Sequence, residues 1–133
     1  MGNLSLAGAL NQGSARDRKQ DITAVDPADV LARVVSLPVS RWSYRDDPDT
    51  AHLGPMAEDF HAVFGVGPDD RHISSVDADG VSLAAIQGLH RLLAEKEARL
   101  RRLEVENQAL AQRLSALERA IRGSAATSGH EVP

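Results

Sequence analysis

The sequence has no cysteine, few aromatic residues and no long run of apolar residues. Without cysteine, no disulfide can stabilise the fold, and the sequence carries no information on the redox compartment. The N-terminus lacks the charged and continuous apolar regions of a signal peptide. No apolar run approaches the roughly 20 residues that a membrane-spanning helix needs, so we expect no membrane partner.

The scarcity of aromatic residues limits the size of the core. All four lie within residues 42–64, and they are Trp42, Tyr44, Phe60 and Phe64. The C-terminal part of the 133-residue chain carries a long helical pattern. Roughly 80 residues therefore remain for a compact domain, which is near the lower limit of independent stability. We expect one small domain that is centred on these aromatic residues and depends on oligomerisation.

Basic residues are unevenly distributed along the chain. Residues 1–90 carry seven Lys or Arg against thirteen Asp or Glu, whereas residues 91–122 carry eight against five. A basic-region leucine zipper places a basic stretch directly before its heptads, but residues 81–89 contain no Lys or Arg. The charge pattern therefore disfavours a DNA-binding zipper protein and predicts no nucleic-acid partner.

The C-terminal part has a heptad repeat with leucine at most a and d positions. These positions are Leu93, Lys96, Leu100, Leu103, Asn107, Leu110, Leu114, Leu117 and Ile121. So narrow an apolar stripe is buried only against another helix, and a 3.5-residue period predicts a left-handed supercoil. The sequence therefore predicts an oligomeric coiled coil over residues 93–122. Leucine at both positions leaves two and three strands open.

Charges beside the stripe favour parallel strands. In parallel, in-register strands each g residue faces the e residue five positions later on its neighbour. Both such pairs attract, and they are Arg99 with Glu104 and Arg113 with Glu118. Asn107 occupies an a position. Its amide can hydrogen-bond there only if Asn107 of another strand lies opposite, so it fixes the register at some loss of stability. The alternative is that Lys96 and Asn107 simply tolerate a hydrated seam.

Upstream of the heptads, short helical and strand-like patterns alternate. Asp or Pro ahead of periodic apolar residues marks helix starts, and Gly or Pro marks their ends. In chain order we expect the end of a short strand over 3–10, a helix from Asp26 and Pro27 to Pro38, a strand over 39–44, a turn at 46–49, a helix from Pro55 to Gly65, a strand over 72–76 and a turn at 77–80.

The long C-terminal helix is expected to begin near Ser82, which can act as its N-cap, and to end near Arg122. Its first turns are more broadly apolar than the heptads, so we expect them to dock on the globular part. The docking residues would be Leu83, Ala84, Ile86, Leu89 and Leu92. The predicted fold class is therefore α+β: a small mixed helix and strand domain followed by a long helix that forms a parallel coiled coil.

Ser14 and Lys19 are the residues most able to carry chemistry. A serine beside small, accessible residues can form a Ser/Lys dyad with a nearby lysine if the lysine loses its proton. A solvated linker is the alternative interpretation of residues 13–21. The five histidines have no ligand-like spacing, so we expect no metal site. No phosphate-binding glycine loop is present, and we expect no cofactor.

Several short segments, in their order and spacing, resemble one family. They are Gly13-Ser14, Lys19-Gln20-Asp21-Ile22, Asp26-Pro27, Trp42-Ser43-Tyr44, His52-Leu53-Gly54-Pro55-Met56-Ala57-Glu58-Asp59-Phe60, and the passage from Val76-Asp77 to Ile86. The family is the C-terminal intramolecular chaperone, or auto-processing, domain of phage endosialidases, tailspikes and tail fibres, which also occurs in bacterial surface proteins.

The resemblance implies a homotrimer that brings three copies of an upstream β-rich stalk of its own polypeptide into register and then cuts itself off. By position it implies cleavage of the Gly13–Ser14 bond, with Ser14 as nucleophile and Lys19 as its base. The implied parts are the end of the stalk over 1–13, the chaperone domain over 14–92, the coiled coil over 93–122 and a disordered tail over 123–133. The protein would belong to a phage tail or virion, or to a bacterial surface, after folding in the host cytoplasm.

Two positions depart from the pattern of this family. Ala15 follows the serine where an aspartate is usual, and Arg18 precedes the lysine where a leucine is common. Asp17 is the nearest carboxylate in the sequence. Two hypotheses follow for residues 13–21: the site of a self-cleaving serine peptidase, or part of a structural trimerisation module of the same fold that never cuts.

Overall fold

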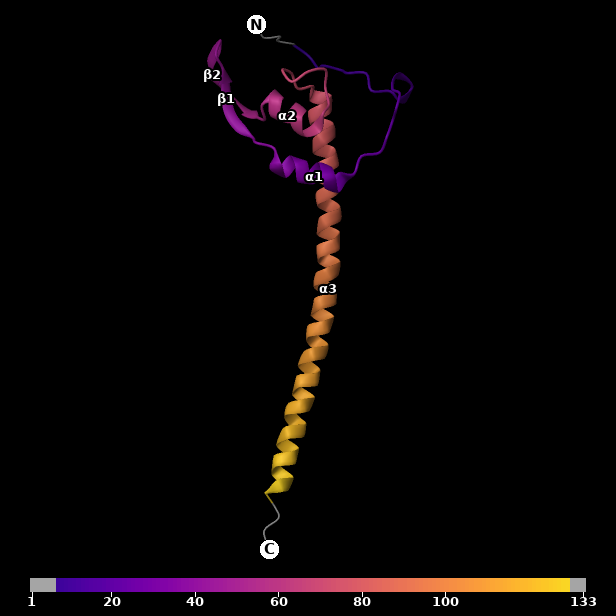
Figure 1. The fold of residues 1–133 in the computed structure, drawn as a ribbon, viewed down its shortest axis with the longest axis vertical. Coiled ribbons are helices and arrows are strands. Elements are labelled where there is room, and N and C mark those ends of the chain that lie inside the picture. The colour runs from indigo at the N-terminus through magenta and orange to yellow at the C-terminus, as the bar shows by residue number, and fades with distance from the viewer. Residues whose placement is uncertain (1–6, 130–133) are drawn as a thin grey trace. The chain divides into compact units, whose positions relative to one another are not determined.

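The computed structural model describes residues 7–129. Its elements, in chain order, are the 3₁₀ helix η1 (Arg16–Arg18), α1 (Pro27–Ser36), β1 (Ser40–Tyr44), β2 (Asp47–Gly54), α2 (Ala57–Phe64) and α3 (Ser75–Ser128) (Figure 1). The mixture of helices with a small antiparallel sheet confirms the predicted α+β class. The chain divides into two units, Met1–Leu89 and His90–Pro133, which are described in turn. Over the described range, every helix is too short or too polar to cross a membrane.

Helix α1 begins and ends where the sequence predicted. The Asp26 side chain accepts a hydrogen bond from the backbone N–H of Ala28 at 3.0 Å, and Pro27 occupies the first turn. This cap satisfies one of the backbone donors that a helix start leaves free. The helix ends at Ser36, two residues before Pro38, because the residue before a proline avoids the helical conformation.

Strands β1 and β2 form an antiparallel hairpin, and β2 corrects the prediction. Residues 46–49 were expected as a turn, but the turn lies at residues 45–46 and the strand begins at Asp47. Trp42 lies opposite His52 in the register, and the pairing is irregular between Trp42 and Tyr44. Pro48 is compatible with a strand here because each strand of a two-stranded sheet has an unpaired edge that does not need the missing N–H.

Helix α2 contributes the most deeply buried large side chain of the described residues. Phe60 is 5% exposed, and its ring lies 5.0 Å from that of Phe64. The helix ends at Gly65, whose φ of 65° lies in the left-handed region that glycine adopts without steric cost. Arg33 of α1 donates a hydrogen bond to the carbonyl of Val63 at 2.8 Å and so ties the C-terminal turn of α2 to α1.

Helix α3 begins at Ser75, which corrects three expectations. The strand over 72–76 and the turn at 77–80 are wrong, because the helix already includes most of these residues. Ser82 is inside the helix rather than its N-cap, and its hydroxyl donates to the carbonyl of Ala78. Asp77 in the first turn suits the positive end of the helix dipole, and an isolated Gly80 costs a helix only about 1 kcal/mol.

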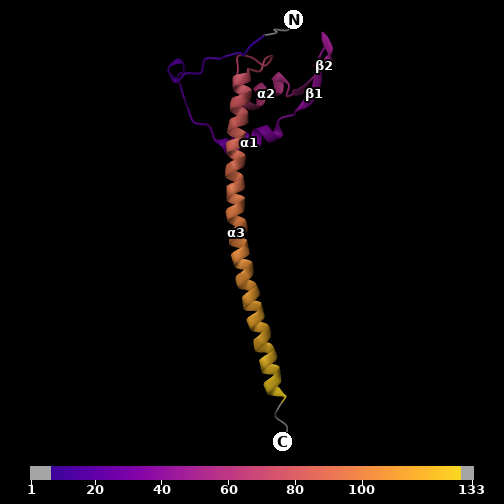
Figure 2. The same ribbon diagram turned by 180° about the vertical axis from the view of Figure 1, so that it is seen from behind.

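The first turns of α3 pack through small residues: of the residues expected to dock, Ala84 is buried, whereas the larger side chains are exposed. Ala84, Ala85 and Gly88 are buried, whereas Leu83 and Ile86 are more than 60% exposed. At Gly88, an added Cβ would lie 2.8 Å from the carbonyl carbon of Pro27. Both ribbon views show α1 lying across this part of α3 (Figures 1 and 2). Small side chains are buried here because only they let the two backbones come this close.

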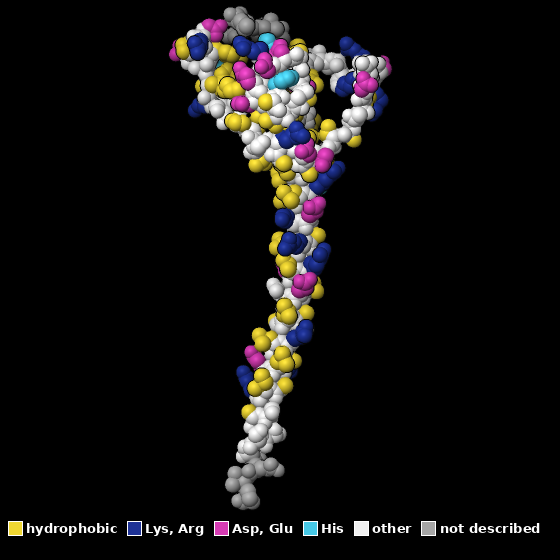
Figure 3. All heavy atoms as spheres, viewed as in Figure 1, with side chains coloured by type: hydrophobic (Ala, Val, Ile, Leu, Met, Phe, Trp, Pro, Cys, Tyr) yellow, Lys and Arg dark blue, Asp and Glu magenta, His cyan; other side chains and the backbone are white. Residues whose placement is uncertain are grey.

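The second unit consists of the remainder of α3. The helix continues to Ser128, so residues 123–128 are helical rather than disordered as predicted. Residues 130–133 of the predicted tail and residues 3–6 of the predicted N-terminal strand lie outside the described residues, and residues 7–10 form no strand. Apolar side chains recur along this helix (Figure 3). Every leucine and isoleucine of the heptads is between 41% and 68% exposed.

We predict that Gly88→Ala destabilises the first unit and that Gly80→Ala does not. The new methyl group at position 88 would press on Pro27 and on the Cβ of Leu31, and such overpacking costs about 1–3 kcal/mol. Gly80 has open space around it, so alanine there should stabilise the helix by up to about 1 kcal/mol. Denaturant unfolding of the two variants measures the difference; equal stability would contradict the close approach at Gly88.

Candidate active site

Ser14 and Lys19 lie in direct contact. The Nζ atom of Lys19 donates a hydrogen bond to the Oγ atom of Ser14 at 2.6 Å. The turn η1 brings them together, because Arg18 N–H bonds to the carbonyl of Ala15 at 3.2 Å and Lys19 N–H to the carbonyl of Arg16 at 3.1 Å. The structure therefore places side by side the two residues that the sequence singled out for chemistry.

The Ser14–Lys19 pair lies in an open, solvated position. Both residues are exposed, and the shallow hollow around them is lined by Ser14, Arg16, Lys19 and Ile22. In the observed hydrogen bond the lysine is the donor and the serine oxygen the acceptor. General-base catalysis needs the reverse polarity, with the serine hydroxyl donating to a neutral amine. The heavy-atom geometry allows both, and the protonation state of the amine decides between them.

Arg18 reaches back over Gly13, a contact that the sequence analysis missed. Its Nη1 atom occupies the space that a Cβ at position 13 would take, and its Cζ atom lies 3.2 Å from that point. Arg18 had been noted only as a departure from the family pattern. The sequence spacing could have predicted this contact. Residues 13 and 18 are five apart, as are residues 14 and 19, and the same turn brings both pairs together.

A second hollow is lined by the aromatic residues of β1 and by the loop before α3. The Trp42 ring stacks on that of His52 at 4.7 Å and meets Tyr44 edge-on at 4.9 Å. Arg71 and His72 also line this hollow, together with Ile73 and residues 55–58. The indole N–H of Trp42 is buried and has no hydrogen-bond partner among residues 7–129. Sequence reasoning placed these rings in the core, but Tyr44 is half exposed.

Asp69 organises the loop that leads into α3. Its carboxylate accepts hydrogen bonds from the backbone N–H of Arg71 at 2.8 Å, from that of His72 at 3.0 Å and from the His72 ring at 3.0 Å. The bond from Arg71 and the contacts of His72 hold the pKa of Asp69 below its ordinary value of 3.8. Within residues 7–129, no three acidic or histidine side chains gather where they could hold a metal ion.

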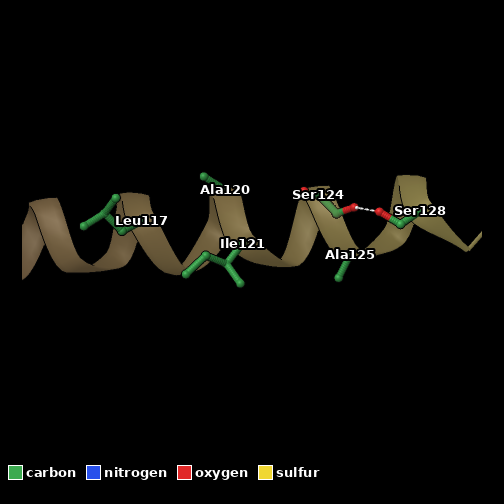
Figure 4. A pocket seen from close by; sticks show the side chains of 6 residues that line it. All are labelled: Leu117, Ala120, Ile121, Ser124, Ala125 and Ser128. Atoms are coloured by element: carbon green, nitrogen blue, oxygen red, sulfur yellow. Dashed lines mark hydrogen bonds between the residues drawn. The ribbon is translucent and has the colours of Figure 1, made fainter.

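A third hollow lies along α3 near its C-terminal end. All of its lining residues belong to this one helix, and they are Leu117, Ala120, Ile121, Ser124, Ala125 and Ser128 (Figure 4). The dashed line in the figure marks a bond from the hydroxyl of Ser128 to the carbonyl of Ser124 at 2.9 Å. A hollow with a single wall is an uncovered helix surface, and Leu117 and Ile121 on it are heptad core positions.

These features define a small α+β domain with a serine–lysine pair ahead of its first helix. Residues 14–67 match the family model described as chaperone of endosialidase, which supports the resemblance found in the sequence. The matched segment begins at the serine of the pair and ends before α3. No curated protein matches the chain.

We predict that the Asp69 carboxyl titrates below pH 3.8 in the folded protein, measured by carboxyl NMR. A lowered pKa stabilises the fold above the unfolded-state value, and this contribution is lost as the pH falls through the folded-state pKa. His72→Ala should move the titration only part of the way back, because the Arg71 N–H, the larger cause, remains. Full return to the unfolded value in His72→Ala would contradict this assignment.

Proposed function

We propose that the chain is an intramolecular chaperone that assembles as a homotrimer, aligns a β-rich fibre or spike upstream in its own polypeptide, and then releases itself by cutting the Gly13–Ser14 bond. The observation that carries the proposal is the 2.6 Å bond between Lys19 and Ser14, at the first residues of a segment that matches the model of a chaperone family. The first residue of that segment is also the residue that would become the new N-terminus.

The proposed reaction begins with transfer of the Ser14 hydroxyl proton to a neutral Lys19. The Oγ atom then attacks the carbonyl carbon of Gly13, and a tetrahedral oxyanion forms. The bond from this carbon to the Ser14 nitrogen breaks, the nitrogen takes the proton from Lys19, and the acyl group is left on Oγ as an ester. Water hydrolyses the ester, which leaves a carboxylate on Gly13 and a free hydroxyl and amine on Ser14.

The proposed assembly rests on the exposed apolar stripe of α3. The residues assigned to the interface are Leu93, Leu100, Leu103, Asn107, Leu110, Leu114, Leu117 and Ile121. The single chain leaves its leucines and isoleucine more than 40% exposed, and burial of such side chains is worth about 1.5–3 kcal/mol each. A parallel trimer would bury the whole stripe and would place three copies of residues 1–13 in the same register.

The second candidate is a trimerisation module of the same fold that does not cut. The observation in its favour is the open position of the dyad, because Lys19 lacks the burial that would favour a neutral amine. Ala15 in place of the usual aspartate also favours this candidate. Assembly and cleavage are therefore tested separately.

We predict that the expressed chain loses residues 1–13, as seen by intact mass, and that Ser14→Ala and Lys19→Ala remain full length. Lys19→Arg is the matched control, because arginine keeps the positive charge but does not give up its proton. It should also stay full length if Lys19 acts as a base. A full-length mass for the unmutated, trimeric chain would refute cleavage and favour the second candidate.

We predict a trimer in sedimentation equilibrium for both the unmutated chain and Ser14→Ala. Asn107→Leu should raise the unfolding midpoint, because a buried amide is replaced by an apolar side chain, and should yield bundles of mixed stoichiometry or register. An unchanged, well-defined trimer in this variant would refute a role for Asn107 in fixing the register. A dimer of the unmutated chain would count against the proposed assembly itself.

A further inference from the structure

Two cationic side chains flank the peptide bond between Gly13 and Ser14. The turn η1 returns the chain so that residues five apart meet: Lys19 contacts Ser14, and Arg18 contacts Gly13. One cation thus lies at the hydroxyl that would attack, and the other lies at the residue whose carbonyl would be attacked.

The guanidinium of Arg18 lies beside the α-carbon of Gly13. Its Nη1 atom overlaps the space that a Cβ at position 13 would fill, and that Cβ would lie one bond from the α-carbon. The guanidinium therefore rests against the α-carbon, and rotation about the bonds of its own flexible side chain can bring an N–H to the carbonyl oxygen. A β-carbon at position 13 would exclude it from this place.

The positive charge of Arg18 is not neutralised by a neighbouring carboxylate among residues 7–129. Among the residues that the structure describes, no carboxylate forms an ion pair with it. Arginine stays protonated at any pH at which proteins fold, whereas a lysine can give up its proton. The two cations are therefore suited to different tasks, a permanent electrostatic one for Arg18 and proton transfer for Lys19.

We propose that Arg18 stabilises the negative charge that develops on the Gly13 carbonyl oxygen when Ser14 attacks. This inference rests on the proposed cleavage. Hydrogen-bond donors that await a developing oxyanion lower the barrier of acyl transfer, and loss of one typically slows such reactions by about 10²–10³. Because Arg18 is exposed and water screens its charge, we expect a slowing of about ten- to a hundredfold on its removal.

The test follows cleavage of the full chain after cell-free synthesis, with intact mass measured at fixed times. Arg18→Met keeps the length of the side chain without its charge, and Arg18→Lys keeps the charge. We expect the rates to fall in the order Arg, Lys, Met. Arg41→Met is the matched control, because it removes one positive charge from an exposed strand residue outside the site, and it should cut at the unmutated rate.

A second measurement tests the contact with Gly13 itself. Gly13→Ala places a methyl group where the guanidinium lies, so it should slow cleavage in the unmutated chain more than in Arg18→Ala. Two residues that act through one contact give such non-additive effects, whereas independent residues give additive ones. Circular dichroism and sedimentation of each variant establish that it folds and assembles.

The outcomes separate the two proposals. Cleavage of Arg18→Met at the unmutated rate would overturn the role of Arg18 and leave the dyad standing. Equal slowing in Arg18→Met and Arg18→Lys would overturn a role based on charge. Additive effects of Gly13→Ala and Arg18→Ala would overturn the contact. An uncut unmutated chain would overturn the proposed cleavage and, with it, the role of Arg18.

Discussion

An apolar stripe that a single helix cannot bury is the constraint on which the rest of the structure depends. From Leu93 to Ile121, α3 exposes leucine or isoleucine at most core positions of its heptads. The first unit has only a small core, around Phe60 and the buried alanines of α3. Neither part carries enough buried apolar surface to explain a stable isolated chain. The proposed association of helices would bury this stripe and would stabilise both parts.

The apolar pattern of α3 did not show which of its residues pack on the first unit. Leu83, Ile86 and Leu89 were expected to dock on the domain because hydrophobic residues dominate burial in most helices. The backbones instead approach closely through Ala84, Ala85 and Gly88, where a large side chain would not fit. A helical period identifies a face, but only the packed structure shows which face meets a nearby backbone. The large residues stay exposed as a consequence.

Sequence signals predicted the elements that local chemistry determines. The cap at Asp26 and the left-handed Gly65 act within a few residues, so the start of α1 and the end of α2 were found, whereas α2 begins at Ala57 rather than at the predicted Pro55. Strand β2 was missed because Asp47 and Pro48 favour turns, and only pairing with β1 makes them a strand. The start of α3 was missed because propagation of a long helix overrides the turn signal of Gly80. For the site, the sequence supplied Ser14 and Lys19, but Arg18 needed the geometry of η1.

The proposed cleavage needs Lys19 in a different environment from the one that it has in the single chain. In the single chain the amine is solvated and donates to Ser14, a polarity that is unreactive. To act as a base, Lys19 must be neutral. Burial of its amine away from water would favour the neutral form. Neighbouring copies could supply such a change only after the helices have associated. A dyad built on an exposed turn would thus stay inactive in an unassembled chain, and cleavage would follow alignment of the upstream segment.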